Sequence, residues 1–208
     1  TPQPLTATDI PDLPATKITS GTFPALNGSN LTNLDASDLT GTLPAISGAN
    51  LTGVSAGKVA QVVQTVKTNT HQHNNTSYTD VSNMNVSITP SATDSKVLIL
   101  VDAHMSWNVN YSGMIRLLRG STAIYVGDSS GSRTQSFYGH ESLSNRQMFQ
   151  VSACFLDSPS TTSSTTYKIQ SLSQSSSSYI EINRDRNDVD ANYSARTASS
   201  ITAMEILA

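Results

Sequence analysis

The sequence predicts an all-β protein in two parts, an extended repeat segment over residues 1–57 and an antiparallel β-sandwich or jelly roll over residues 58–208. Prolines and glycines recur through the first part, which disfavours long helices and inner sheet strands. From Lys58 onward, short apolar and β-branched runs alternate with Ser, Asn, Asp and Gly turns, with almost no helical periodicity. Many short strands separated by turns are typical of a sandwich.

The first part contains an internal repeat. Gly21–Leu34 aligns with Gly41–Val54, twenty residues further on, and eight of the fourteen positions are identical. Each unit carries isolated apolar residues at a regular spacing, and repeat architectures need about three units to build a core. We therefore expect other chains, wound around a common axis, to cover these side chains. A flexible Pro/Gly/Ser linker is the alternative interpretation.

The second part reads as a series of short strands. In the strand around residues 96–106, Val97, Ile99 and Val101 share one face, and Leu98 and Leu100 share the other, so we expect burial on both sides. The strands that we predict are 59–69, 77–89 with a break near Ser82, 96–106, 113–119, 122–127, 147–156, 165–173, 178–183 and 200–207.

Composition narrows the possible partners. The net charge is −3 and charged residues make up 13% of the chain, so a nucleic-acid binder or a polybasic membrane anchor is not expected. No apolar run approaches the ~18 residues of a spanning helix, so we expect no membrane insertion. The single cysteine, Cys154, lies in an apolar run, where we expect a small buried hydrophobic residue rather than a reactive thiol.

Several segments together resemble a known class of proteins. They are the repeat Gly41–Val54 and the runs Gln61–Thr68, Val86–Ser91, Lys96–Val101, Leu118–Thr122, Phe155–Pro159 and Ala198–Ile206. With these segments the chain resembles the distal parts of tail fibres and related receptor-binding proteins of tailed phages, cyanophages and other marine phages especially. These are structural signatures, and none is a catalytic motif.

The resemblance implies a homotrimer, in which a slender three-chain shaft ends in a knob of three β-sandwiches. It further implies a place in the virion at the distal end of a tail fibre, held by a baseplate or proximal fibre protein. The host partner would be a surface glycan or an outer-membrane protein, and no cofactor would be required. Binding residues are expected in loops on the rigid sandwich.

Two histidines form a candidate metal site. In an extended chain His71 and His73 point to the same side. Three copies around a trimer axis would offer six nitrogens to a transition-metal ion. Fibre and spike tips of some phages are similar in holding iron in this way. A pair of surface or loop histidines is the alternative, as is direct contact with the receptor.

Aromatic residues in predicted loops suggest sugar recognition, because a flat ring can cover the apolar face of a pyranose while amides take the hydroxyls. Core packing is the alternative for each of them. The residues that we select for receptor contact are Trp107, Asn108, Tyr111, Tyr138 and His140.

An acidic loop near the C-terminus offers a weaker candidate. Asp188, Asp190 and Asn192 have the spacing of the first calcium ligands in a calcium loop, but the later glycine and acid are missing, which favours a solvated turn. We expect no enzyme, because the acids are scattered and no nucleophile elbow, zinc motif or phosphate loop occurs. The alternatives to an adhesive tip are a purely structural virion fibre or decoration protein and, from another class, a polysaccharide-degrading tailspike.

Overall fold

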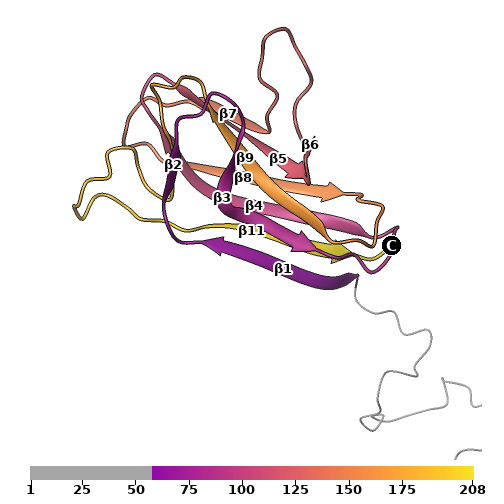
Figure 1. Cartoon of the computed structure of the whole chain (residues 1–208). Helices are drawn as coiled ribbons and strands as arrows, with labels where there is room; N and C mark the ends of the chain where they lie inside the picture. The colour runs from indigo at the N-terminus through magenta and orange to yellow at the C-terminus, as the bar shows by residue number, and fades with distance from the viewer. Residues whose placement is uncertain (1–57) are drawn as a thin grey trace, which may run out of the picture. The chain divides into compact units, whose positions relative to one another are not determined.

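Residues 58–208 form two antiparallel β-sheets in the computed structural model (Figure 1), and the structure is described for these residues. The predicted shaft segment, residues 1–57, lies outside the described residues. The first sheet, here called sheet A, has β4 at its centre. β8 pairs with one edge of β4, and β11 and β10 pair with successive parts of its other edge. Outside these lie β1 and β2. The strands of sheet A are β1 (Val59–Lys67), β2 (His71–His73), β4 (Lys96–Trp107), β8 (Phe149–Asp157), β10 (Ile180–Ile182) and β11 (Ser199–Ile206).

The second sheet, sheet B, has the order β3, β9, β5, with β6 and β7 both paired to the remaining side of β5. All its pairings are antiparallel. The strands of sheet B are β3 (Thr79–Ile88), β5 (Ser112–Arg119), β6 (Thr122–Ile124), β7 (Tyr138–Glu141) and β9 (Thr165–Ser173). The predicted all-β, antiparallel fold is confirmed for residues 58–208, and the arrangement is that of a β-sandwich.

The core lies between the two sheets and follows from the two-residue period of the strands. In β4 the odd-numbered residues from Val97 to Trp107 are buried, and they face Ile115 and Leu117 of sheet B. The largest fully buried side chains are Trp107, Tyr167, Lys67, Met84, Ile88, Ile99, Met105, Ile115, Leu117, Ile169, Ile180 and Ile182.

The two ends of the sandwich differ. Lys58 and the C-terminal residues lie together at one end, where the Leu207 amide donates to the Lys58 carbonyl at 2.8 Å and Lys58 Nζ donates to the Ala208 carbonyl at 2.8 Å. We call this the entry end. The loops 108–111, 142–148 and 183–198 lie at the opposite end, which we call the loop end. The chain therefore enters and finishes at one end, and the other end is free to carry loops.

A buried carboxylate fastens the turn between β3 and β4 at the entry end. Glu205 is 1% exposed and accepts hydrogen bonds from the Ser91 amide (2.6 Å), Ser91 Oγ (2.6 Å), Ser95 Oγ (2.8 Å) and Gln61 Nε2 (2.8 Å). Although burial alone would raise it, these donors hold the pKa of Glu205 down at about 2. The charged form is therefore the one that the native structure stabilises.

We expect Glu205→Gln to lower the free energy of unfolding at pH 7 by about 1–3 kcal/mol, because buried donors lose a charged acceptor. Since the native pKa lies below the ordinary value of 4.5, the contribution of Glu205 is present above that value and is lost as the pH falls towards 2. Urea unfolding at several pH values should therefore show a smaller acid loss in the variant. Glu141→Gln, an exposed acid on β7, is the control, and an equal acid loss in both variants would contradict the assignment.

The outer face of sheet B is polar. Lys168 Nζ and Gln170 Nε2 both donate to the Asp80 carboxylate at 2.7 Å, and Arg116 donates to Gln170 Oε1 at 2.7 and 2.9 Å. The Arg116 guanidinium also lies 4.0 Å from the centre of the Tyr78 ring. The charged and polar groups on this face hydrogen-bond to one another. Among residues 58–208, no helix is long and apolar enough to cross a membrane.

The expected burial of Cys154 is wrong, because the structure places this thiol on the exposed outer face of sheet A. In β8 the residues Phe149, Val151 and Ala153 point inward, so Cys154 points outward together with Leu156. The polar residues Gln150 and Ser152 share the outer face with Cys154, so the alternation from Phe149 to Ala153 indicates this orientation.

Candidate functional site

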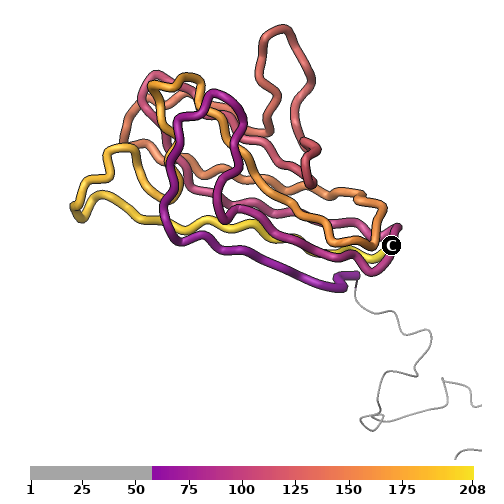
Figure 2. The backbone as a smooth tube through the Cα atoms, in the orientation of Figure 1, coloured from indigo at the N-terminus to yellow at the C-terminus, as the bar shows by residue number. Residues whose placement is uncertain are grey.

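A long loop projects from the side of sheet B that carries β6 and β7 (Figure 2). It comprises residues 125–137, between the end of β6 and the start of β7, whereas most connections in compact domains have about 4–6 residues. Its base is closed, because the Gly127 amide donates to the Ser136 carbonyl (3.2 Å) and Gln135 Nε2 donates to the Gly127 carbonyl (2.8 Å). Tyr78 Oη also donates to the Gln135 carbonyl at 2.7 Å. The loop is therefore held at its base and exposed over 127–135.

A polar hollow of about 500 Å³ lies between this loop and the strands β5 and β7. Gly139 faces the hollow without a side chain, and a Cβ atom there would lie 3.5 Å from Ser136 Oγ and 3.7 Å from Met114 Cγ. Met114 is the apolar side chain that lines it, and the remaining groups are polar and can donate to and accept from a polyhydroxylated ligand. These polar residues are Ser112, Ser132, Arg133, Thr134, Ser136, His140 and Glu141.

An aromatic patch adjoins the polar hollow. Tyr125 is 44% exposed, and its ring centre lies 5.9 Å from that of Phe137 and 5.1 Å from that of Phe155. Tyr125, Phe137 and Ser136 also line a second hollow of about 280 Å³, so Ser136 borders both hollows. An exposed ring next to convergent polar groups offers both an apolar surface and hydrogen-bonding groups to a ligand.

Two of the predicted contact residues lie at this place. Tyr138 and His140 are on the same side of β7, and both pack near Phe149, at ring-centre distances of 6.5 and 5.1 Å. Burial raises the pKa of the Tyr138 hydroxyl. The His140 Nδ1–H donates to the Glu141 carbonyl, so Nε2 of the neutral ring is an acceptor. Of the five predicted residues, His140 alone lines the hollow.

Trp107 is a correction to the predicted contact set. Its side chain is fully buried and stacks on Phe149, with ring centres 4.4 Å apart and 11° between the planes. A ring with no exposed surface cannot contact a receptor, and the alternative of core packing is what the structure shows. We leave Trp107 out of the proposed contact surface.

Asn108 and Tyr111 lie at the loop end, and neither lines the polar hollow. Asn108 Oδ1 accepts hydrogen bonds from the Tyr179 amide at 2.9 Å and from Arg186 Nε at 3.0 Å. Tyr111 is half-buried, and its carbonyl accepts from the Ser142 amide at 2.9 Å. Both residues tie neighbouring loops together, which gives them a structural task whether or not they also meet a ligand.

His71 and His73 form β2, and their rings do lie on one side, 6.0 Å apart. That side faces the interior, because His73 Nε2 lies 2.7 Å from Ser171 Oγ of sheet B. His73 Nδ1 accepts from the Asn75 amide at 3.2 Å, so Nε2 carries the proton and both nitrogens of His73 are engaged. Burial lowers the pKa of both histidines, and Lys67 lowers that of His71 further. A metal ion shared on a trimer axis stays a prediction, and it would require both rings to turn outward.

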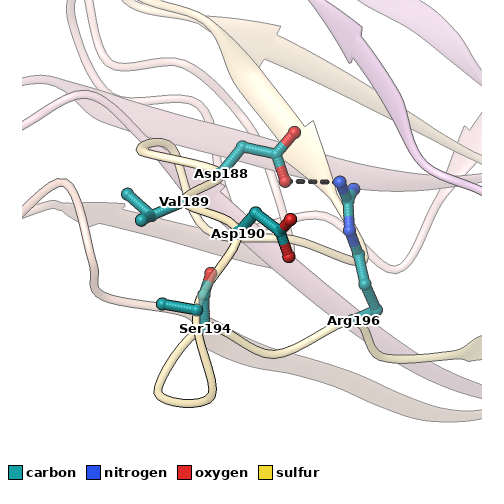
Figure 3. A pocket seen from close by; sticks show the side chains of 6 residues that line it. Asp188, Val189, Asp190, Ser194 and Arg196 are labelled. Carbon is teal, nitrogen blue, oxygen red and sulfur yellow. Dashed lines mark ion pairs between the residues drawn. The ribbon is translucent and has the colours of Figure 1, made fainter.

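The acidic loop forms a smaller hollow of about 180 Å³ at the loop end (Figure 3). Arg196 Nη2 lies 2.6 Å from the Asp188 carboxylate, and Arg184 also pairs with Asp188. Although burial alone would raise it, the pKa of Asp188 is lowered by these two arginines. In residues 58–208, no three His, Cys, Asp or Glu side chains gather as ligands for a metal ion. The ion pairs at Asp188 fit the solvated turn better than a calcium site.

No protein-family model matches the chain, and no curated protein matches its sequence.

Proposed function

We propose that this chain is the receptor-binding tip of a phage tail fibre, which attaches the virion to a bacterial surface without enzymatic activity. The observation that supports the proposal is the exposed Tyr125 ring beside the polar hollow of Arg133, His140 and Glu141, on a loop held at its base. The ligand that fits these groups is a surface polysaccharide, whose ring faces are apolar and whose edges are hydroxylated.

The resemblance to phage fibres supplies the biological setting of the proposal. In that setting the chain forms a homotrimer, and a baseplate or proximal fibre protein holds its N-terminal side. Three tips on one fibre, and several fibres on one virion, would add modest affinities to a firm attachment through effective concentration. Such an arrangement does not require a deep pocket, and open hollows fit it.

Two alternatives were open from the sequence. A purely structural fibre protein needs no hollow flanked by exposed aromatic residues, so this feature favours the adhesive tip. A depolymerase of the glycosidase type needs two carboxyl groups about 5–9.5 Å apart on either side of the substrate. Glu141 is the single acid among the described residues that line the polar hollow, which favours binding without hydrolysis.

Tyr125→Ala is expected to weaken binding to bacterial capsular and lipopolysaccharide glycans by about 2- to 10-fold at each site, because a stacked ring contributes about 0.5–1.5 kcal/mol. The measurement is binding of the full chain to a glycan array at low ligand density, followed by calorimetry with the best oligosaccharide. Tyr193→Ala is the matched control, because Tyr193 is 64% exposed and lies in the loop 183–198, which forms the acidic hollow at the loop end.

Loss of binding in Tyr193→Ala but not in Tyr125→Ala would move the site to the loop end. Binding to no glycan, with protein that sticks to whole bacteria in a protease-sensitive way, would replace the glycan by an outer-membrane protein. Release of reducing ends from the polysaccharide by the purified chain would contradict the non-enzymatic proposal.

A further inference from the structure

The outer face of sheet A is divided into two halves that differ in what covers them. Near the loop end, Arg184 and Arg186 from the loop 183–198 lie over this face and pair with the fully buried Glu181 of β10. Ser106 Oγ of β4 donates to the Arg184 carbonyl at 2.9 Å. This half of the face is therefore closed by the chain's own loop.

Near the entry end, the described residues leave the same face uncovered. The strand register places Val62, Met204, Leu98 and Leu156 in one row across β1, β11, β4 and β8. Val62 is 54% exposed and Leu156 is 52% exposed at the two ends of the row. The next row towards the loop end holds Gln64, Thr202, Leu100 and the exposed Cys154.

The first row is apolar at all four positions, and Leu100 and Cys154 extend it, whereas Gln64 and Thr202 are polar and pair with each other at 2.8 Å. A contiguous apolar patch on an exposed sheet face marks an interaction site. The outer face of sheet B shows the contrast, because its strands carry the Asp80, Lys168, Gln170 and Arg116 network instead. A partner for this row must therefore be apolar, and charge does not select it.

The sequence before β1 indicates which partner would pack on this face of sheet A. The repeats Gly21–Leu34 and Gly41–Val54 carry apolar residues that two copies cannot bury alone, and the second repeat ends five residues before β1 begins at Val59. If copies of the chain wind together through these repeats, as the sequence predicts, their β1 strands begin close to one another. β1 is an outer strand of sheet A, and Val62, which is 54% exposed, brings the apolar row to that edge. The nearest apolar surface would then be the same face of another copy.

We propose that the entry half of the outer face of sheet A, carried by Val62, Leu98, Leu156 and Met204, is the surface through which copies of this chain contact one another. The same face serves in every copy, so the contact can close around an axis. The inference concerns the assembly that the proposed function includes, and it does not depend on glycan binding.

The test compares three full-length chains by light scattering over a range of concentrations. The wild type is expected at three times the chain mass of 22.1 kDa. Leu156→Lys should dissociate at a protomer concentration at least about tenfold higher than the wild type, because it buries a charge in the contact. Leu143→Lys is the matched control, since Leu143 is a leucine exposed by 73% that lies outside this face, and it should keep the wild-type mass.

Cys154 gives a second measurement on the same samples, because it is the single cysteine of the chain and lies on this face. Its rate of maleimide labelling should be low in the assembled wild type and in Leu143→Lys, and high in Leu156→Lys. Circular dichroism verifies that the variants are folded, and Val62→Lys replaces Leu156→Lys if the latter does not fold.

Three outcomes would overturn the inference. A monomeric wild type with slow labelling would mean that residues of the same chain cover the face. A monomeric wild type with fast labelling would leave the face free for a different protein. A trimer that Leu156→Lys and Val62→Lys do not weaken would place the contact elsewhere. A trimer that responds as expected but binds neither glycans nor whole bacteria would refute the proposed function and leave this inference standing.

Discussion

Trp107→Ala is expected to lower the free energy of unfolding by about 3–5 kcal/mol, the range for removing a large aromatic side chain from a core. Trp107 is fully buried, stacks on Phe149 and lies edge-on to Tyr138 at 6.3 Å. The measurement is urea unfolding followed by circular dichroism, because Trp107 is the only tryptophan and its fluorescence is lost in the variant. All variants are compared at one protomer concentration, since assembly adds to apparent stability.

Trp107→Phe separates packing from hydrogen bonding. The indole Nε1 is buried and has no hydrogen-bond partner among the described residues, so its removal leaves no acceptor unpaired. Phe fills part of the space, and we expect a loss well below that of the alanine variant. If Trp107→Ala changed stability by less than about 1 kcal/mol, the ring would not be packed as described.

Gly113 tests the same contact from the other sheet. A Cβ atom at this position would lie 2.7 Å from Trp107 Cε3 and 3.0 Å from Ile180 Cδ1. Gly113→Ala should therefore cost about 1–3 kcal/mol in the wild-type background, the range for overpacking. In the Trp107→Ala background the added methyl group enters the space that the indole leaves, and the cost should shrink. Additive losses would show that the two residues do not touch.

The fold was predictable because most strands carry a clear two-residue period. The two strands that sequence analysis missed are short. β2 has three residues and β7 has four, and β7 contains Gly139, which has little preference for a strand. Their pairing depends on what β10 and β5 offer as neighbours, and the local sequence does not encode that.

Trp107 and Tyr125 show why the contact residues were harder to predict than the strands. The predicted central strand ended at residue 106, which made Trp107 a loop residue, yet the buried odd-numbered positions of β4 continue through it. Tyr125 was assigned to a strand over 122–127, but its φ of 53° ends β6 and turns the chain into the projecting loop. An error of one or two residues at a strand end decides whether an aromatic side chain is buried or free.

The apolar outer face of sheet A was partly visible in the sequence. Leu98 and Leu100 alternate with the buried residues of β4, which predicted burial on both sides of that strand. In the structure of residues 58–208 they are only half-buried. A neighbouring copy packed on this face would bury the surface of Leu98 and Leu100 that is exposed here.

Glu181→Ala is expected to lower the free energy of unfolding by about 1–3 kcal/mol, because Arg184 and Arg186 lose their hydrogen bonds to a buried carboxylate, although Arg184 keeps its ion pair with Asp188. Glu181 is fully buried, and its Oε2 accepts from Arg184 Nε at 2.8 Å and Nη2 at 2.6 Å. Arg186 Nη1 donates to Oε1 at 3.3 Å. Urea unfolding of the full chain at pH 7 measures the loss.

The effect should reach beyond stability, because these arginines hold the loop 183–198 on sheet A. Arg184 also forms an ion pair with Asp188, and Arg186 Nε also donates to Asn108 Oδ1 at 3.0 Å. Hydrogen exchange should therefore rise over residues 183–198 in Glu181→Ala while the amides of β5 and β9 stay protected. Glu181→Gln keeps the shape and one acceptor oxygen, and it should recover part of both losses. Desolvation raises the pKa of Glu181, so its native form binds a proton more tightly than the unfolded chain does.

The sign of that shift provides a check on the assignment. A raised native pKa makes the wild type lose stability relative to Glu181→Gln as the pH rises above the ordinary glutamate value of 4.5, the opposite of the Glu205 effect. If the wild type instead gained stability relative to Glu181→Gln over that range, the two arginines would outweigh burial. The native pKa of Glu181 would then lie below 4.5, and the direction assigned here would be wrong.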